Sequence, residues 1–254
     1  MLDLNELCGM RGKNAVITGA ASGLGAGIAR FFADAGVKVL LLDINEKGGE
    51  EVAAEIRAGG GEAAFMRCNV TSQADCAAAA EAALRRWVNC AGATRRRTVE
   101  DLEEKDWDLV LNVTLKSVYL MCHNVVPYMK KQGHGKIVNI GSGWALKGGD
   151  QAVAYCASKG GVWNMTRALA IDCGPHNINV NCVCPGDSDT PMLKSECEQL
   201  GGTYDSAFKA SCAARPIARL GTPEDVAMCV FFLCSGMSPW VTGSALVVDG
   251  GGIA

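Results

Sequence analysis

The segment Thr18-Gly19-Ala20-Ala21-Ser22-Gly23-Leu24-Gly25 carries the strongest information about the fold. It follows an apolar run of strand length, Asn14 to Thr18, and it opens a segment with a helical pattern, Leu24 to Ala35. Glycines at this spacing allow a tight turn and a close backbone approach, and the positive end of the helix can face a pyrophosphate. The segment therefore predicts a dinucleotide-binding turn, and a plain glycine-rich turn is the alternative.

Strand-length and helix-length segments continue to alternate after this turn. Lys38 to Asp43 and Ala63 to Cys68 have strand patterns, and Glu46 to Ala58 between them has a helical one. A βαβαβ succession requires parallel strands with helices on both faces. Further helices are expected at Cys76 to Leu84, Trp107 to Lys131, Tyr155 to Cys173 and Pro223 to Cys234, and further strands at Lys136 to Ile140, Ile178 to Cys184 and Ala245 to Val248. We predict an α/β fold, a single doubly wound parallel sheet of the Rossmann type, formed by one domain over residues 1–254.

The composition narrows the classes of protein. The chain has 254 residues, 49% hydrophobic and 20% charged, which suits one globular domain with a sizeable core. A formal net charge of -3 gives no basic field for nucleic acid or anionic lipid, so neither partner is expected. No uninterrupted apolar run approaches the roughly 20 residues of a membrane span, and no signal peptide is recognisable. We expect a cytoplasmic protein.

Cysteine is abundant, with 13 residues, yet the sequence has no Cys-x-x-Cys pair. The odd number argues against a disulfide framework, and most of these residues are expected as buried, reduced thiols. Cys182 and Cys184 should share one face of a strand, but no neighbouring His or Cys completes a tetrahedral set, so no metal site is expected. A thiol-based redox or metal protein is the least favoured function.

Asp43 ends the second predicted strand, where a carboxylate can accept hydrogen bonds from both hydroxyls of an adenine ribose. A 2'-phosphate would meet like charge there, and neither Ala20, Ala21 nor Ile44 offers a cation to hold it. The sequence therefore predicts NAD rather than NADP. The alternative role of Asp43 is to cap the following helix.

Tyr155 and Lys159 lie one helical turn apart and share a helix face. A phenol with a pKa of about 10 is a weak base near neutrality, but a nearby ammonium favours the phenolate. Ser142, just after a predicted strand, could hydrogen-bond a reacting oxygen. Each residue alone could be purely structural, whereas the three together predict proton transfer.

At this point the sequence resembles the short-chain dehydrogenase/reductase family over nearly its whole length. The resemblance rests on the glycine turn, Asn89-Cys90-Ala91-Gly92, Asn112, Ser142, Tyr155-x-x-x-Lys159, and Pro185-Gly186 with Thr190. It implies that Tyr155 is the catalytic acid/base and that Lys159 lowers its pKa and holds the nicotinamide ribose. It also implies that Ser142 orients the substrate oxygen and that Asn112 supports a proton-relay water.

The resemblance implies a set of cofactor-binding residues: Gly19, Ser22, Gly23, Leu24, Gly25, Asp43, Asn69, Val70, Asn89, Ala91, Gly92, Tyr155, Lys159, Pro185, Gly186, Ser188 and Thr190. Two of these depart from the usual pattern, because Asn69 stands where members often have Asp and Ser188 where they usually have a branched apolar residue. Both contacts are expected to survive. Members are commonly tetramers, so a homotetramer, or else a homodimer, is the expected assembly.

A larger departure from the family precedes Asn89. A helical alanine run continues through Leu84-Arg85-Arg86-Trp87-Val88 almost to Asn89. A turn and a full strand between the helix and Asn89 would need about six more residues than the sequence has there. Arg85 and Arg86 suit a doubly buried strand poorly. We expect either a shortened helix or a stub of a fourth strand, with weak local order beside the cofactor.

Three loops after strands should shape the substrate site: Ala93 to Thr98, Trp144 to Val153, and Pro191 to Arg215, the last as a mobile lid. Arg95-Arg96-Arg97 is interpreted as a solvated charge run, with an anion-attracting role as the alternative. The leading hypothesis is an oxidoreductase that transfers a hydride between NAD and a small secondary alcohol or ketone. A nucleotide-binding scaffold or sensor of the same fold, with little turnover, is the second.

Overall fold

The fold is a single parallel sheet with helices on both faces, as the sequence predicts. The computed structural model describes residues 7–82, 86–213 and 215–254. All six strand pairs are parallel, and the strand order is β3-β2-β1-β4-β5-β6-β7. The strands are β1 (Asn14–Thr18), β2 (Lys38–Asp43), β3 (Ala63–Arg67), β4 (Arg86–Asn89), β5 (Gly135–Ile140), β6 (Ile178–Pro185) and β7 (Ala245–Val248).

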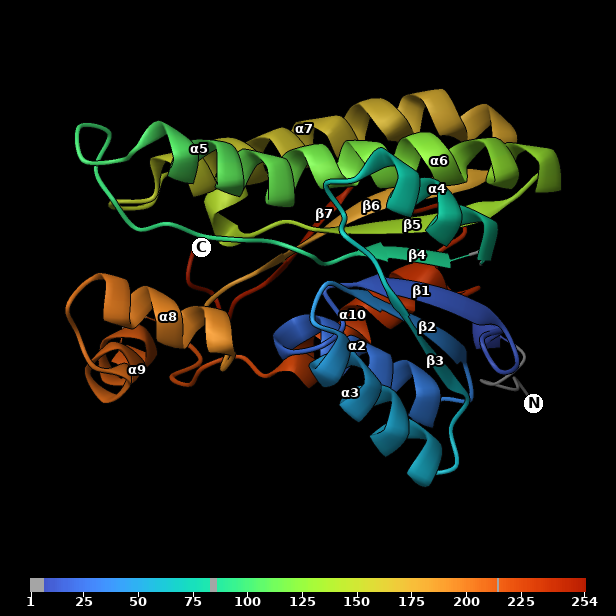
Figure 1. Cartoon of the computed structure of the whole chain (residues 1–254), viewed down its shortest axis with the longest axis horizontal. Coiled ribbons are helices and arrows are strands. Elements are labelled where there is room, and N and C mark those ends of the chain that lie inside the picture. Colours follow the sequence, from blue (N-terminus) through green and yellow to red (C-terminus); the bar gives the residue numbers. More distant parts are fainter. Residues whose placement is uncertain (1–6, 83–85, 214) are drawn as a thin grey trace.

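Two layers of helices enclose the sheet (Figure 1). The helices are α2 (Gly23–Asp34), α3 (Glu46–Ala58), α4 (Gln73–Ala82), α5 (Glu104–Leu111), α6 (Ser117–Gln132), α7 (Val153–Cys173), α8 (Pro191–Gln199), α9 (Tyr204–Ala213) and α10 (Pro223–Cys234). Helices α2, α3 and α10 pack on one face through one apolar cluster, and α4, α6 and α7 pack on the other through a second.

Local sequence explains where several helices begin. The α10 helix starts at a capping box in which Thr222 and Asp225 each hydrogen-bond the other's backbone N–H, with Pro223 in the first turn. The Asn45 side chain caps α3 by accepting a hydrogen bond from the Gly48 N–H at 3.1 Å. This assigns the cap to Asn45 and not to Asp43, so the alternative role for Asp43 as the helix cap is wrong.

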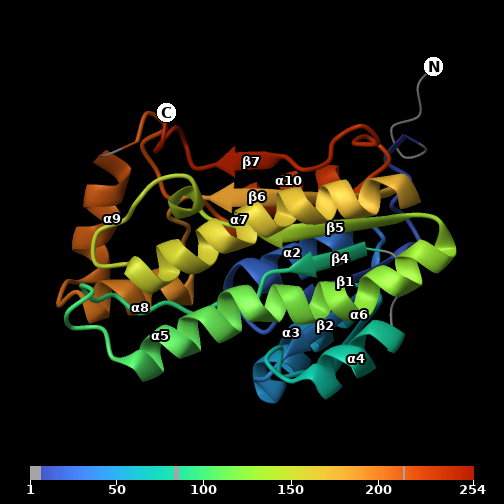
Figure 2. The same cartoon turned by 90° about the horizontal axis from the view of Figure 1, so that it is seen from above.

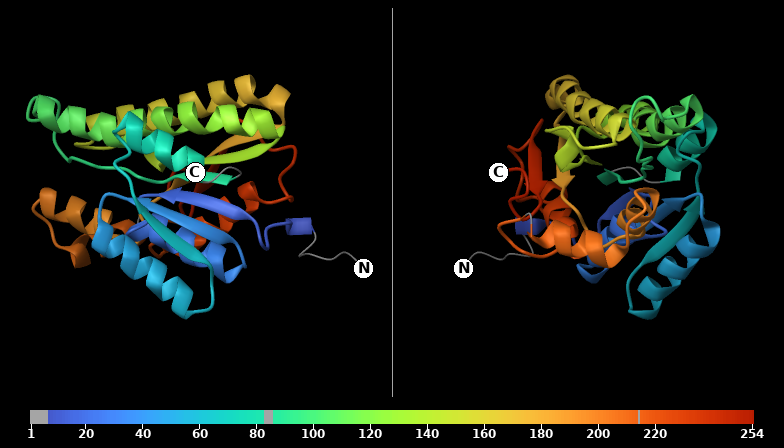
Figure 3. Two further views of the ribbon diagram at one scale, coloured as in Figure 1. Left: turned by 45° about the vertical axis from the view of Figure 1, so that its right-hand side comes forward. Right: turned by 90° about the vertical axis from the view of Figure 1, so that its left-hand side faces the viewer.

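The winding of the chain reverses at β1, which pairs with β2 on one side and β4 on the other. In a doubly wound sheet such a reversal leaves a crevice beyond the carboxyl ends of the two central strands. Helices α8 and α9 lie at this end of the sheet (Figure 2), on the same side of the molecule as the start of α5 (Figure 3).

The fourth strand is a four-residue stub. Trp87 and Val88 are fully buried and pair with both β1 and β5. Arg86, which we expected to fit poorly, begins the strand and donates a hydrogen bond from Nε to the Cys234 carbonyl at 2.9 Å. This bond gives the half-buried guanidinium a partner at the amino end of the strand. The expectations for Arg85 and for weak local order there fall outside the described residues.

The segment Pro191 to Arg215, which we predicted as a loop acting as a mobile lid, contains two helices, and the sequence analysis did not foresee them. The signal was present in the sequence: Thr190 accepts a hydrogen bond from the Leu193 N–H at 3.4 Å, and Pro191 occupies the first turn of α8. A threonine cap followed by proline is a common helix start.

The helix predicted at Trp107 to Lys131 is continuous but contains a π-helical turn, Asn112–Lys116, between α5 and α6. By length and composition alone, Glu104–Gln132 could cross a membrane. Its inner face packs against the sheet and α4, as the core helix of a globular fold does. Length and composition alone are therefore weak support for a membrane span.

Candidate active site

One cavity of about 610 Å³ opens at the carboxyl ends of the central strands. It is lined by nearly all the residues that the sequence singled out: Gly19, Ser22, Gly23, Leu24, Gly25, Asp43, Asn69, Val70, Ala91, Gly92, Ser142, Tyr155, Lys159, Pro185, Gly186, Ser188 and Thr190. Asn89 and Asn112 are not among the lining residues.

The glycine turn is held in a shape that other residues would not permit. Gly19 has φ of 68° and Gly23 has φ of 53°, both in the left-handed region. A Cβ on Gly25 would lie 2.1 Å from the Gly19 carbonyl oxygen. The Thr18 hydroxyl accepts hydrogen bonds from the N–H groups of Cys90 and Ala91, both at 3.0 Å, which ties this turn to the end of β4.

Asp43 faces the cavity from the end of β2, and its carboxylate holds two backbone groups. Oδ2 accepts a hydrogen bond from the Ala21 N–H at 3.0 Å, and Oδ1 accepts one from the Asn45 N–H at 2.9 Å. These bonds fix the carboxylate against the glycine turn. Each oxygen keeps a further lone pair for a ligand hydroxyl.

Of the two asparagines outside the lining, Asn89 has hydrogen-bond partners within the sheet. Asn89 is buried, and its amide accepts from Trp87 Nε1 at 2.9 Å and donates to Asn139 Oδ1 at 2.8 Å, so its side chain stays within the sheet. Asn112 begins the π-helical turn. In the same turn Thr114 exchanges hydrogen bonds with the backbone of Ala93, at 3.0 and 3.1 Å. A cofactor contact of the Asn89 side chain is therefore not supported.

Tyr155, Ser142 and Lys159 meet at the other end of the cavity. Lys159 Nζ lies 5.6 Å from the centroid of the Tyr155 ring and donates a hydrogen bond to the Ile140 carbonyl at 2.7 Å. Ser142 follows β5, and its Oγ accepts a hydrogen bond from the Trp144 N–H at 3.1 Å. The helix spacing and the end of β5 thus bring the three predicted groups together.

The pKa of Tyr155 differs from the one we expected. Burial raises the pKa of Tyr155 above its usual value, the negative charge of Glu196 raises it further, and a hydrogen bond with Ser142 lowers it in part. Burial also lowers the pKa of Lys159. The expectation that Lys159 brings the phenol pKa below its ordinary value is therefore wrong for this structure, in which burial of the phenol is the largest influence and raises its pKa.

The sequence reasoning missed a buried ion pair beside Tyr155. Arg96 Nη1 lies 3.3 Å from Glu196 Oε2, and their side chains are only 9% and 13% exposed. Arg96 is therefore not part of a solvated charge run. Its neighbours differ, since Arg95 pairs with Asp106 at 3.0 Å and Arg97 is exposed. Nothing local in the triple arginine distinguishes the middle residue, because its partner comes from α8.

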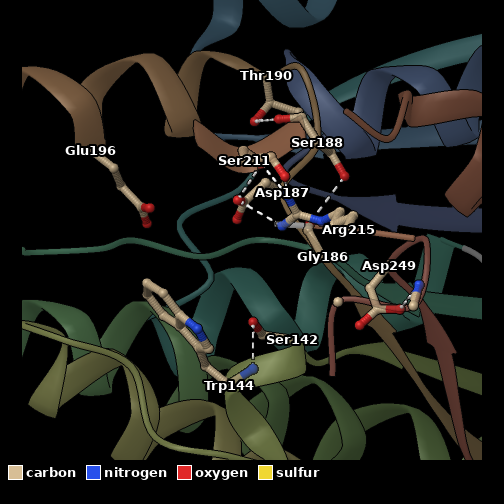
Figure 4. Close-up of polar contacts among 12 residues, drawn as sticks. Ser142, Trp144, Gly186, Asp187, Ser188, Thr190, Glu196, Ser211, Arg215 and Asp249 are labelled. Atoms are coloured by element: carbon tan, nitrogen blue, oxygen red, sulfur yellow. Dashed lines mark hydrogen bonds and ion pairs between the residues drawn. The ribbon is translucent and has the colours of Figure 1, made fainter. Parts of the chain in front are cut away.

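A second ion pair fixes the end of α9 (Figure 4). Arg215 Nη2 lies 2.7 Å from Asp187 Oδ2, and Ser211 Oγ donates to the same oxygen at 2.7 Å. Arg215 also donates to the Ser211 carbonyl at 2.6 Å. Asp187, Ser211 and Arg215 all line the cavity, so these contacts join α9 to the loop after β6 at the cavity wall.

The cysteines form no disulfide among the described residues, and eight of the 13 are buried. Cys182 and Cys184 share a strand face as predicted, with their Sγ atoms 3.8 Å apart. Within the described ranges, no three His, Cys, Asp or Glu side chains come together as a metal site.

Comparison with known proteins places this geometry in context. A family model described as enoyl-(acyl carrier protein) reductase matches residues 19–252. The chain is 36% identical to a 3-oxoacyl-[acyl-carrier-protein] reductase of Thermotoga maritima, over 95% of this chain and 98% of that protein. It is 37% identical to a cyclopentanol dehydrogenase of a Comamonas species, over 94% and 96%.

A solved structure has the same architecture. It is described as an NAD(P)-dependent gluconate 5-dehydrogenase from Beutenbergia cavernae with bound NADP at low occupancy. The two structures match with a TM-score of 0.89 and 33% identity, over 96% of this chain and 97% of the other. Together with the glycine turn and the cavity that follows it, these similarities show that the chain belongs to the short-chain dehydrogenase/reductase family of oxidoreductases.

Proposed function

We propose that the protein oxidises a secondary alcohol with NAD, or reduces the corresponding ketone with NADH, and that Tyr155 is the acid/base. The observation that carries this proposal is a single cavity with the glycine turn and Asp43 at one end and Tyr155 with Ser142 at the other. Such a cavity can hold an extended dinucleotide with its reactive ring beside the phenol.

The residues present fit a nicotinamide dinucleotide. A Cβ on Gly25 would collide with the turn, so the backbone is packed closely where a pyrophosphate would approach the start of α2. The Asp43 carboxylate, fixed by two backbone N–H groups, favours ribose hydroxyls and repels a 2'-phosphate. Asp43 therefore supports NAD, although one relative was solved with NADP.

Tyr155 and its neighbours would handle the proton. In oxidation, Tyr155 Oη accepts the carbinol proton while the bound cofactor supplies the hydride acceptor. Ser142 Oγ, beside the phenol, holds the substrate oxygen by a hydrogen bond. Lys159, anchored on the Ile140 carbonyl at 2.7 Å, positions its ammonium group beside the Tyr155 ring.

The test is turnover of a panel of secondary alcohols with NAD and NADP in parallel, followed by the absorbance of the reduced cofactor. We expect turnover with NAD, and in Tyr155→Phe a loss of about a hundredfold to ten-thousandfold in kcat because the general base is absent. Binding of NADH, measured by fluorescence, should persist in this variant.

The matched control is Tyr119→Phe, since Tyr119 is an exposed tyrosine on α6, 52% accessible and away from the cavity. It should retain full activity. NADH binding without turnover of any alcohol or ketone would instead indicate the nucleotide-binding scaffold. Normal turnover by Tyr155→Phe would exclude Tyr155 as the acid/base.

A further inference from the structure

The substrate end of the cavity contains a carboxylate that hydride transfer does not require. Glu196 lines the cavity together with Ser142, Tyr155 and Trp144. Figure 4 shows it on α8, with its carboxylate on the side of the helix that faces the Trp144 indole. Its negative charge raises the pKa of Tyr155, which places it within electrostatic reach of the reacting phenol.

Arg96 supports this carboxylate from behind. The guanidinium contacts Glu196 Oε2 at 3.3 Å, donates to the Asp150 carbonyl at 2.7 Å, and stacks 4.7 Å from the centre of the Trp144 ring. Arg96 is 8% exposed and is not among the cavity-lining residues. A molecule that enters the cavity therefore meets the carboxylate and the indole, with the guanidinium behind them.

This order of groups selects among ligand chemistries. An anionic substrate would meet the Glu196 carboxylate before it could reach Arg96. A cationic one would gain little, because Arg96 already compensates the charge. A neutral hydroxyl can donate to a carboxylate, which has about four lone-pair sites. Arg96 takes one of them, and the Thr94 hydroxyl lies close enough to act on a second, so acceptor sites remain for a ligand. A purely apolar substrate would leave this buried oxygen with less hydration and no new partner.

We propose that Glu196 determines specificity by accepting a hydrogen bond from a second hydroxyl of the substrate, so that the protein acts on neutral diols or polyols in preference to simple alcohols. The proposal rests on the oxidoreductase function proposed above. Arg96 is a positioning residue, which holds the carboxylate in place without contacting the substrate.

The test compares matched pairs of alcohols that differ only in a second hydroxyl, vicinal cyclopentanediol with cyclopentanol and vicinal butanediol with secondary butanol. The unaltered protein should favour each diol in kcat/KM by about tenfold or more, because a buried polar group discriminates strongly against an analogue without its partner. The double variant Arg96→Met with Glu196→Leu should lose this preference.

The double variant replaces the whole pair by apolar side chains of similar size, which avoids a buried unpaired guanidinium and keeps the fold. In the double variant, kcat/KM should fall for each diol relative to its simple alcohol, because the change in the pKa of Tyr155 that follows loss of the Glu196 charge acts equally on both members of a pair. The affinity for NADH should not change. Glu196→Gln retains a carbonyl acceptor and should keep part of the diol preference. Glu198→Gln, an exposed residue on the same helix, is the control and should match the unaltered protein.

The outcomes separate the two proposals. Oxidation of simple alcohols with no advantage for diols would overturn the role of Glu196 alone. An equal loss for both members of each pair in the double variant would also overturn it and would show that the pair merely supports α8. Failure to oxidise any alcohol would overturn the proposed function, and this inference with it.

Discussion

The two ends of the cavity are built differently. The end at the glycine turn and Asp43, where we propose the cofactor binds, depends on backbone groups, whereas the end near Tyr155, where we propose the substrate binds, depends on ion-paired side chains. Gly25 packs its backbone against the Gly19 carbonyl, and Asp43 is fixed by two backbone N–H groups within the β1–β2 region. At the substrate end, Arg96 meets Glu196 across 100 residues of sequence, and Arg215 meets Asp187. The two ends therefore depend on different kinds of interaction.

This difference between the two ends indicates where substrate specificity can change within the fold. Backbone geometry at the cofactor end depends on a few glycines and on the strand edges, so a common dinucleotide site is retained together with the fold. The ion pairs at the substrate end join α8 and α9 to loops of the sheet, and a single substitution can remove one. This agrees with relatives whose names give substrates as different as cyclopentanol and a 3-oxoacyl-[acyl-carrier-protein].

The substitution Asp43→Asn should change the preference between NAD and NADP without affecting the substrate end of the cavity. It removes the charge that repels a 2'-phosphate and keeps one carbonyl acceptor. We expect the ratio of kcat/KM with NAD to that with NADP to fall by about tenfold to a hundredfold, since each tenfold corresponds to about 1.4 kcal/mol. Steady-state kinetics with both cofactors measures this ratio, and diol preference should stay unchanged.

Glu46→Gln is the control for Asp43→Asn. Glu46 is exposed in the first turn of α3, carries the same charge and does not line the cavity. It should leave the cofactor ratio as it is. An unchanged ratio in Asp43→Asn would show that another group selects the cofactor and would weaken the assignment of NAD.

Arg215→Met should disturb the substrate end with a smaller effect. It removes the contacts to Asp187 and Ser211 that attach α9 to the loop after β6. We expect KM for the alcohol to rise by roughly threefold to tenfold, because the cavity wall is less well positioned, with the NAD to NADP ratio unchanged. Steady-state kinetics at saturating cofactor would measure it.

The matched control for Arg215→Met is Arg219→Met, which breaks a more exposed ion pair with Asp225 at the start of α10. Exposed pairs contribute about 0 to 1 kcal/mol, so stability should fall slightly and KM should not change. A change in the cofactor ratio of Arg215→Met, with KM unaltered, would contradict the separation of the two ends.

The sequence was informative where function depends on local backbone pattern. The strand and helix alternation, the glycine turn and the Tyr155 to Lys159 spacing are all short-range, and the fold and cavity contain them where they were predicted. Side-chain partners that lie far apart in the sequence could not be predicted from it. Arg96 sits in a run of three arginines, and only the packing of α8 distinguishes it from its neighbours.

Two other errors have equally physical origins. The segment that contains α8 is predicted as a loop from Gly201-Gly202 and its many polar residues, and that prediction does not consider the helix start at Thr190-Pro191. The pKa of Tyr155 was expected to fall because Lys159 lies one turn away, yet burial of the phenol dominates and raises it. The depth of a side chain follows from tertiary packing, which the spacing of two residues does not reveal.

The smallest expected effect concerns Tyr155, the proposed acid/base. Oxidative kcat/KM should rise with pH as the phenol loses its proton, and the reductive reaction should fall. Because the charge of Glu196 raises the pKa of Tyr155, Glu196→Gln should lower that pKa and move both profiles to lower pH. Glu198→Gln should not move them. A shift to higher pH would mean that the carboxylate acts on the phenol in some way other than through its charge.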